Sequence, residues 1–486
     1  MSKARQVLWT GAAAAAVTAA AAAFLLLKEP QPEKEMQPEK EMQPLLFEAE
    51  AGVLNGVHAA AELSGYSGDG YVTGFDDDED SLTVFVEAPE DGLYDMWVGY
   101  SSPGGDKYTM LSLDDRQAAE IRLAASGTFT EAYAGKWLLR TGRNEVLISR
   151  NWGWYNMDYI KIRKARKRPE HRVERRLVNP DATPETVELF NFLADQYGKH
   201  ILSGQQTLLD SLKLLHKYGK EPAITGFDLM EYSPSMAEYG TKPDEVSDIL
   251  MWHNRGGIVT LAWHWNAPTG LLNTPDQPWY RGFYAEASTF DVEQALADPE
   301  SENYRLLLRD IDAIAVPLKQ LQDLRIPILW RPLHEAEGGW FWWGAKGPEP
   351  AKQLYRLLYD RLTNVHGLNN LIWIWNSEDP AWYPGDDVVD IVSIDSYPKP
   401  GDYSPISHRY ENLVQLVQDR KLAAMTENGP IPDPDLLVKT ETHWSWFCTW
   451  NGDFINDGIQ NSEDHIRHVL NHEYVLTLDE VKELRS

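Results

Sequence analysis

Two glutamates, Glu335 and Glu427, each stand at the end of a short apolar run, 328–333 and 422–426. Hydrolysis of a glycosidic bond needs two carboxyl groups that flank the bond, one to donate a proton and one to attack the sugar or to activate water. A gap of about 5–5.5 Å between them would indicate a retaining, covalent mechanism. Aromatic residues fill 340–343, just after Glu335, and flat rings of this kind can stack on sugars. These residue types predict a glycoside hydrolase.

Short apolar runs alternate with helical patterns throughout the second part of the chain. Buried parallel strands have this appearance, and eight of them interleaved with helices predict a closed (β/α)8 TIM barrel over residues 180–480. An open, doubly wound sheet is the alternative, but no glycine-rich phosphate loop follows the first run. The runs are 200–203, 223–227, 258–263, 328–333, 371–375, 391–394, 422–426 and 446–450.

Polar side chains gather directly after these runs. Gly204-Gln205-Gln206 follows the first run, and Asp228 ends the second. The active site of such a barrel lies at the C-terminal ends of its strands, so we expect these side chains to face one another. A helix is predicted over 180–198, with Thr183 before Pro184 at its start.

The segment Trp330–Glu335, continuing into Trp340–Gly344, resembles the acid/base segment of glycoside hydrolase family 26. Members of this family are mostly endo-β-1,4-mannanases with a (β/α)8 fold, and they hydrolyse with retention. Most relatives in the wider clan carry Asn before the acid/base Glu, whereas His334 stands here, as in family 26. The resemblance covers roughly residues 180 to 475, with further matches at 200–206, 262–266, 395–397 and 426–429.

The resemblance implies a role for each matched residue. Glu335 would be the acid/base and Glu427 the nucleophile. Like charge from Glu427 would favour the protonated form of Glu335, and Arg331 would help to keep Glu427 ionised. No cofactor is expected for catalysis. The matched residues that would bind substrate are His264, Arg331, His334, Trp340, Tyr397 and Trp450, with Tyr397 orienting the nucleophile and the two tryptophans stacking on sugar rings.

Residues 46–163 show short alternating runs separated by turn residues, which predicts an antiparallel β-sandwich. Phe47–Glu50, Gly65–Val72 and Trp154–Ile160 resemble carbohydrate-binding module family 35, whose jelly-roll-like β-sandwiches usually hold a structural Ca²⁺. The resemblance implies calcium ligands at Glu48, Glu50 and Asp158. The first two are expected to point the same way on one strand.

Sugar binding by this module would need an exposed ring with hydrogen-bonding groups beside it. Trp152 and Asn156 are the candidates, and Tyr66 is a weaker one. The acidic run 76–80 is expected to be a solvated loop rather than a second calcium site.

The N-terminal segment is predicted to serve targeting. Lys3 and Arg5 precede an apolar run, so residues 1–27 are expected to be a secretory signal peptide. The run is long enough to span a bilayer, and an uncleaved membrane anchor is the alternative. A Pro/Glu/Lys-rich spacer at 28–45 follows, with the repeat QPEKEM. A basic segment at 164–179 is expected to be a solvated interdomain linker rather than a nuclear signal.

Composition excludes several other classes of protein. The net charge is −29 over 486 residues, which repels phosphate backbones and argues against a nucleic-acid partner. Cys448 is the only cysteine, so no intrachain disulfide forms. His468 and His472 have helical spacing, but no HExxH motif occurs and a metal site there is disfavoured.

Taken with the resemblance, these features predict a secreted, monomeric, retaining endo-β-1,4-mannanase acting on mannan, glucomannan or galactomannan. Two alternatives stay open. A family-26 enzyme can instead act on β-1,3-xylan or mixed-linkage β-glucan. A non-catalytic polysaccharide-binding protein on a decayed barrel is the other, and the presence of both glutamates counts against it.

Overall fold

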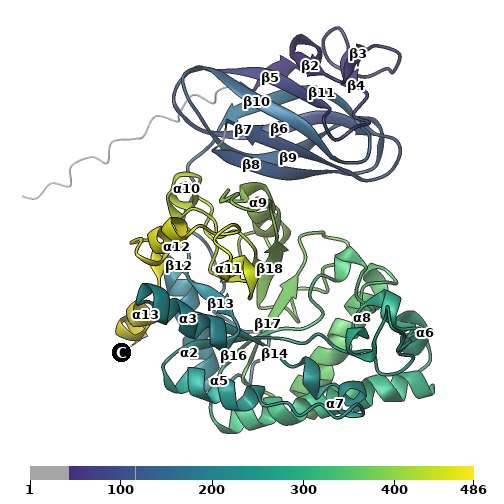
Figure 1. The fold of residues 1–486 in the computed structure, drawn as a ribbon, viewed down its shortest axis with the longest axis vertical. Helices are drawn as coiled ribbons and strands as arrows, with labels where there is room; N and C mark the ends of the chain where they lie inside the picture. The colour runs from purple at the N-terminus through teal and green to yellow at the C-terminus, as the bar shows by residue number, and fades with distance from the viewer. Residues whose placement is uncertain (1–42, 115, 486) are drawn as a thin grey trace, which may run out of the picture. The chain divides into compact units, whose positions relative to one another are not determined.

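The computed structural model describes residues 43–114 and 116–485, which form a β-sandwich followed by a barrel (Figure 1). One sheet of the sandwich has the order β3-β4-β11-β6-β9, with β1 also paired to β11. Its strands are β1 (Leu45–Glu48), β3 (His58–Ala60), β4 (Tyr71–Thr73), β6 (Gly92–Ser102), β9 (Ser126–Leu139) and β11 (Asn156–Lys164). Because all strand pairings in this sheet are antiparallel, the predicted sandwich is confirmed.

The second sheet of the sandwich has the order β2-β5-β10-β7-β8. Its strands bury alternate residues, for example Leu82, Val84 and Val86, as expected when one face covers a core. The strands are β2 (Val53–Asn55), β5 (Ser81–Ala88), β7 (Lys107–Leu113), β8 (Gln117–Leu123) and β10 (Gly142–Trp152).

Eight parallel strands, β13 to β20, close into the predicted barrel. Nearly every residue of these strands is buried, because the barrel interior lies on one side and helices cover the other. Figure 1 shows helices such as α3 (Leu208–Tyr218), α5 (Glu245–Asn254), α7 (Glu302–Asp323) and α8 (Pro348–Tyr359) around the outside. The strands are β13 (Gly204–Gln206), β14 (Ile224–Asp228), β15 (Ile258–Ala262), β16 (Ile328–Arg331), β17 (Leu371–Asn376), β18 (Ile391–Ser396), β19 (Leu422–Asn428) and β20 (Phe447–Thr449).

The first barrel strand differs from the prediction. The apolar pair Ile201–Leu202 forms β12, which pairs with β21 (Val475–Leu476) outside the barrel. The barrel strand is instead Gly204–Gln206, which was expected to follow it. Gly204 fits here because a Cβ would lie 2.3 Å from the carbonyl oxygen of Phe447 on the neighbouring strand. A glycine-and-glutamine strand has no apolar pattern, and for this reason the sequence pointed to the wrong segment.

The predicted helix at 180–198 is α2 (Pro184–Gln196). Thr183 caps its first turn by accepting a hydrogen bond from the backbone N–H of Thr186, and Pro184 occupies the first helical position. The predicted capping signal therefore places the start of this helix correctly.

The basic segment before this helix has no regular secondary structure from 165 to 179, as expected of a linker, but it is only partly solvated. The Arg168 side chain forms an ion pair with Glu411 and is mostly buried, and His171 lies 2.6 Å from Asp419 through its Nδ1. Leu177 is also buried. Partners on the barrel satisfy these charges, so the segment lies against the barrel surface.

Among the described residues, no helix has both the length and the apolar character that a bilayer span requires. The predicted signal peptide or anchor at 1–27, and nearly all of the spacer at 28–45, lie outside the described part of the chain.

Candidate active site

Glu427 lies inside β19, near the C-terminal end of the seventh barrel strand, and is almost fully buried. Its carboxylate forms an ion pair with Arg331, and it accepts a hydrogen bond of 2.5 Å from the hydroxyl of Tyr397. Burial raises the pKa of Glu427, while the Arg331 charge and the Tyr397 hydrogen bond oppose that rise. These two partners stabilise the ionised form of this carboxyl group and orient it.

Glu335 follows β16, the fourth strand, and has a left-handed backbone with φ of 53°. Such a backbone is strained for a residue other than glycine, and strain of this kind is typical of functional sites. Its N–H donates to Asn376 Oδ1 at 2.8 Å, and its carboxylate accepts from Trp340 Nε1 at 3.0 Å. The loop therefore aims this side chain from a fixed position.

The two carboxyl groups face one another. Glu335, Asp395 and Glu427 each present an oxygen within 4.8 Å of the others. This closeness agrees with the short separation of a retaining glycosidase and not with the wider gap that an inverting enzyme needs for water. Glu335 also lines an open pocket, so substrate can reach it.

The surroundings of Glu335 and Glu427 determine which of the two carboxyl groups is more easily protonated. Burial, together with the charges of Asp395 and Glu427, raises the pKa of Glu335 to about 8. Glu427 has a cation and a hydroxyl donor as direct partners, whereas Glu335 has only an indole N–H. When two coupled carboxyls share one proton, the group with fewer partners for its charge holds it. This asymmetry favours a protonated Glu335 and an ionised Glu427.

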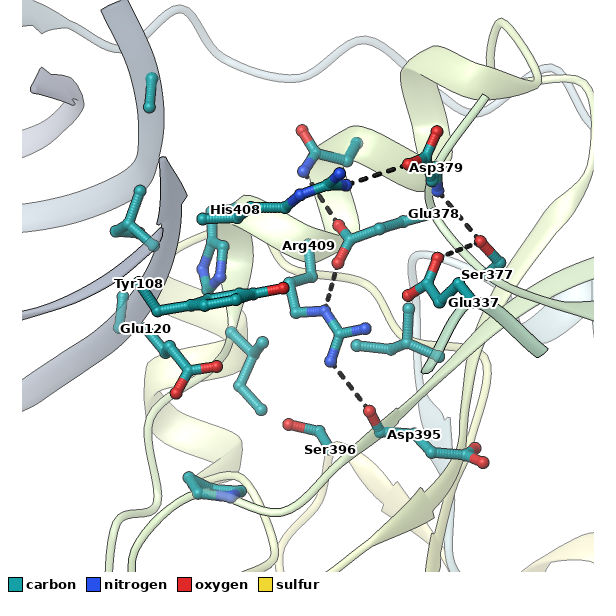
Figure 2. A pocket seen from close by; sticks show the side chains of 18 of the residues that line it. Tyr108, Glu120, Glu337, Ser377, Glu378, Asp379, Asp395, Ser396, His408 and Arg409 are labelled. Carbon is teal, nitrogen blue, oxygen red and sulfur yellow. Dashed lines mark hydrogen bonds and ion pairs between the residues drawn. The ribbon is translucent and has the colours of Figure 1, made fainter. Parts of the chain in front are cut away.

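Asp395 joins this pair from the end of β18. It accepts from Arg331 at 2.8 Å and from the side chain of Asn376 at 3.0 Å. Figure 2 shows Arg409 between the Glu378 carboxylate and this strand end, where the guanidinium donates to the carbonyl oxygen of Asp395 at 2.8 Å. Arg409 belongs to α9 (Ser407–Leu416), so a helix fixes the position of the strand that carries Asp395.

Aromatic and imidazole rings form the wall beside the carboxyl groups. His264 and His334 meet edge to face at 4.4 Å between ring centroids, and Phe341 packs against both. The ring of Trp450 lies 6.3 Å from that of His264. Trp340 is 48% exposed and offers an accessible ring at the rim. The structure therefore brings all six sequence-predicted binding residues of the barrel to one site.

Sequence reasoning missed several residues of this wall. Asp228 was noted only as a strand end, yet its carboxylate forms an ion pair with His264. Phe283 packs against His264 at 5.0 Å, and it comes from a long irregular loop that no periodicity could place. Tyr239 stacks on Trp279 in neighbouring loops at 4.6 Å, with its exposed ring near the same end of the barrel.

The predicted calcium ligands lie near one another in the sandwich, but Glu48 and Glu50 are not on one strand as expected. Glu48 ends β1, but Glu50 lies in the 3-10 turn Ala49–Ala51, so the two do not share one strand. Both keep a buried Oε2 atom with no hydrogen-bond partner. Asp158 accepts from the backbone N–H of Ser67 at 2.9 Å, and burial raises its pKa to about 6, as do the charges of Glu48 and Glu50. Unpartnered carboxylate oxygens of this kind fit a Ca²⁺ ion.

The predicted sugar contacts of the module lie in different surroundings. Trp152 is 58% exposed, with the Lys107 ammonium 4.8 Å from its ring centroid. Asn156 is 4% exposed and its amide N–H donates to Ser101 Oγ, so its part in sugar binding stays a prediction. Tyr66 packs against Tyr71 and Phe129.

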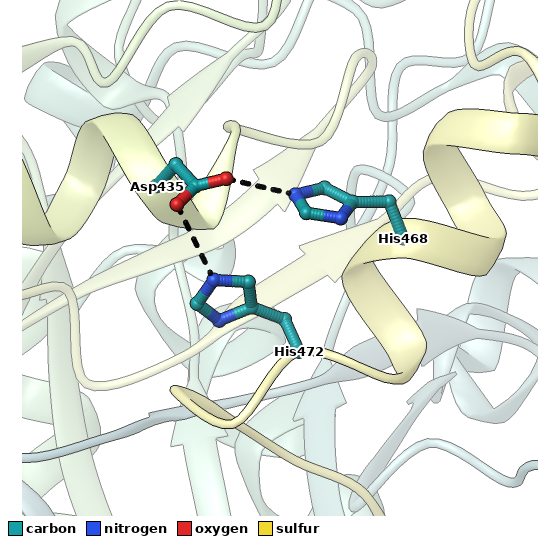
Figure 3. Close-up of side chains that lie close together, drawn as sticks. All are labelled: Asp435, His468 and His472. Carbon is teal, nitrogen blue, oxygen red and sulfur yellow. Dashed lines mark ion pairs between the residues drawn. The ribbon is translucent and has the colours of Figure 1, made fainter.

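A cluster of one aspartate and two histidines joins α10 (Pro434–Lys439), which carries Asp435, to α12 (Glu463–Leu470), which carries His468, and to His472 just after α12. Figure 3 shows Asp435 between His468 and His472, with Nε2 atoms at 3.3 and 3.7 Å from its oxygens. Nδ1 of His472 accepts the backbone N–H of Tyr474 at 3.0 Å, so the neutral ring keeps its proton on Nε2. That proton points to the carboxylate and occupies the position that a metal would need. The Nδ1 contact of His472 therefore disfavours metal binding through its Nε2.

Two family models match the chain. The model of glycosyl hydrolase family 26 matches residues 178–480, and the model of carbohydrate binding module family 35 matches residues 45–165. These ranges contain the barrel and the sandwich, respectively.

Similar proteins include two named mannan endo-1,4-beta-mannosidases. One from Thermothelomyces thermophilus is 49% identical over 90% of this chain and 90% of its own length. Mannan endo-1,4-beta-mannosidase A of Piromyces sp is 34% identical over 90% of this chain and 72% of its own. The crystal structure of a Podospora anserina GH26-CBM35 beta-(1,4)-mannanase is 46% identical, covers 91% of this chain and 99% of that one, and has a TM-score of 0.68.

Proposed function

This chain belongs to glycosyl hydrolase family 26, and from that premise we propose that it is a retaining endo-β-1,4-mannanase with Glu335 as acid/base and Glu427 as nucleophile. The observation that carries the assignment is the asymmetry of the facing carboxyls. Of the two glutamates, Glu427 is the one bound by Arg331 and Tyr397, while Glu335 lies across a short gap with a raised pKa. No cofactor takes part in this scheme.

In the first step, Glu427 attacks the anomeric carbon of a mannosyl unit. The bond from that carbon to the leaving oxygen breaks, and Glu335 gives its proton to this oxygen. The negative charge of Glu427 is consumed in the new ester bond. Glu335 gains the negative charge that Glu427 loses, and Arg331 still balances Asp395, so the net charge of the site does not change when the intermediate forms.

In the second step, a water molecule replaces the released sugar chain. Glu335 is now ionised and no longer faces a charged Glu427, so it takes a proton from the water as the oxygen attacks. The ester bond breaks, Glu427 regains its charge, and the product keeps the β configuration. The wall of His264, His334, Trp340 and Trp450 is proposed to hold the sugar during both steps.

Substrate choice is tested by reducing-sugar release from galactomannan, glucomannan, β-1,3-xylan and lichenan. We expect cleavage of the two mannans and release of short oligosaccharides, as the named relatives suggest. Cleavage of xylan or lichenan with mannans left intact would contradict the substrate assignment but not the mechanism. Binding of mannan without any cleavage would favour the non-catalytic alternative.

We also propose that the sandwich binds mannan chains and holds a structural Ca²⁺ through Glu48, Glu50 and Asp158. Trp152 is the exposed ring best suited to stack on a sugar. A binding module on the same chain keeps the catalytic barrel close to an insoluble polymer. The protein is further proposed to be exported, and the expected monomer stays a prediction.

Removal of calcium is expected to destabilise the sandwich more at pH 7 than at pH 5. The Asp158 carboxyl has a raised pKa of about 6 in the ion-free site, against about 3.9 in an unfolded chain. Between these values the folded state binds the extra proton, so stability falls as pH rises and the contribution is lost above about 6. Thermal unfolding with EDTA, with and without excess Ca²⁺, measures this at both pH values.

The matched variant is Asp158→Asn, which removes one of the three charges. We expect a smaller response to Ca²⁺ and a weaker pH dependence after chelation. An unfolding midpoint that is unchanged by complete chelation at pH 7 would rule out a structural calcium ion.

A further inference from the structure

Asp228 lies behind His264 at the end of β14 and is held by three hydrogen bonds. Its Oδ1 accepts the backbone N–H groups of Met230 at 2.9 Å and of His264 at 3.1 Å. Its Oδ2 forms an ion pair with the Nδ1 of His264. A carboxylate fixed in this way accepts a proton-bearing Nδ1, so the imidazole of His264 has its Nδ1–H directed at Asp228.

The other nitrogen of His264 faces a second imidazole. His264 Nε2 lies 3.1 Å from Nε2 of His334, so one of the two must carry the proton between them. Within the described part of the chain, Nδ1 of His334 is buried without a hydrogen-bond partner, and the rings of Phe341 and Trp343 pack against its imidazole. The indole N–H of Trp343 is already donated to the carbonyl oxygen of His334. A ring face can accept an N–H but cannot donate to a lone pair, so these surroundings favour Nδ1–H on His334.

The Nδ1–H tautomer of His334 determines which of the two histidines carries the proton between their Nε2 atoms. If His334 carries its proton on Nδ1, its Nε2 is an acceptor and must receive the Nε2–H of His264. His264 then has a proton on both nitrogens and is an imidazolium ion. Burial lowers the pKa of His264, but Asp228 and, more weakly, Glu427 raise it, and the net direction is upward. Burial and the charges of Arg331 and His264 lower the pKa of His334, which stays neutral.

We propose that Asp228 is a positioning residue that holds His264 as an imidazolium ion, so that His264 donates to His334 and adds a second positive charge beside the Glu427 carboxylate. The inference rests on the proposed role of Glu427 as nucleophile. The charged groups around this pair are Asp228 on β14, Arg331 and Glu335 at β16, Asp395 at β18 and Glu427 on β19. Arg331 is shared with Asp395, so a separate cation helps to keep Glu427 ionised.

The variant Asp228→Asn removes the charge and keeps the shape. The amide oxygen remains with the two backbone N–H groups, and the NH2 group then faces Nδ1 of His264. His264 becomes neutral with its proton on Nε2, and it still donates to His334. Loss of activity in this variant therefore reports on charge, not on a collapsed wall.

The pH profile of kcat/KM on mannan is the first readout. Asp228→Asn removes the Asp228 anion and the His264 cation together. Of these two charges, that of His264 acts on Glu427 and lowers its pKa, so we expect this pKa to rise and the acidic limb of the Asp228→Asn profile to move to higher pH by up to about one unit. The alkaline limb should move less. Asp435→Asn, which breaks a similar Asp–His pairing on the distant α10, is the control and should leave both limbs in place. An acidic limb of Asp228→Asn at the wild-type position would overturn the proposal.

Proton NMR of the full chain with ¹⁵N-labelled histidine gives a second readout that does not depend on activity. We expect both N–H signals of His264, assigned by comparison with His264→Asn, to persist well above pH 6.5 in the wild-type protein. In Asp228→Asn the Nδ1–H signal should disappear. Deprotonation of wild-type His264 below pH 6.5 would overturn the proposal even if Asp228→Asn fails to fold. Wild-type protein without mannanase activity would contradict the proposed function alone.

Discussion

Replacement of Glu427 by alanine is expected to reduce kcat on mannan by about 10⁵-fold, because no other group can form the glycosyl bond. Burial of the site should keep water from substituting efficiently for the missing carboxylate. The reduction should appear in kcat more than in KM, since the stacking rings and His264 remain. Steady-state kinetics on galactomannan measures the effect, and Glu349→Gln on the exposed start of α8 serves as the control.

Rescue of the Glu427→Ala variant by a small anion tests the mechanism more sharply than the loss of activity in that variant. The Glu427→Ala variant leaves a space beside Arg331 that azide can enter. With an aryl β-mannobioside that carries a good leaving group, azide should attack the anomeric carbon as the phenolate departs. The product should be the α-mannosyl azide, because the attack comes from the face that Glu427 occupied. A β-azide product, or wild-type activity without azide, would show that Glu427 is not the nucleophile.

The barrel could be predicted from sequence where strands are apolar throughout. Buried parallel strands such as 371–376 and 422–428 give continuous apolar runs, and seven of the eight were found close to their observed positions. The exception, Gly204–Gln206, is polar, and its buried Gln205 side chain donates to the carbonyl oxygens of Gln206 and Trp450. Pattern reasoning cannot distinguish such a strand from a loop.

The part of the candidate site that lies at strand ends could be predicted from the sequence. Glu335, Glu427, His264 and Tyr397 come directly after or within strands, so the barrel rule brings them together. Phe283 and Trp279 come from the long loop after β15, whose path depends on packing and not on local propensity. Asn156 was predicted to contact a sugar, but it is buried in the sandwich. The sequence could not show this, because an alternating strand does not reveal which face of the sheet is covered. The tautomers of the two histidines likewise depend on partners that only the fold brings together.

Replacement of Glu335 by alanine is expected to separate the two steps of the reaction. On mannan, kcat should fall by about 10²–10⁴-fold, since the departing sugar oxygen receives no proton. With a 2,4-dinitrophenyl β-mannobioside the leaving group needs no proton, so the first step should stay fast. The second step lacks its base, and a burst of dinitrophenolate followed by slow turnover should reveal the accumulated intermediate on Glu427.

The same variant makes a contrasting prediction about azide and pH. Azide needs no general base, so it should accelerate the second step and give the β-mannosyl azide, the opposite anomer to that expected from Glu427→Ala.

The wild-type kcat/KM should fall above about pH 8, where Glu335 loses the proton that it must donate. On mannan, this alkaline limb should be present in Glu349→Gln and absent from the residual activity of Glu335→Ala. An alkaline limb that survives in Glu335→Ala would assign it to another group and leave the proton donor unidentified.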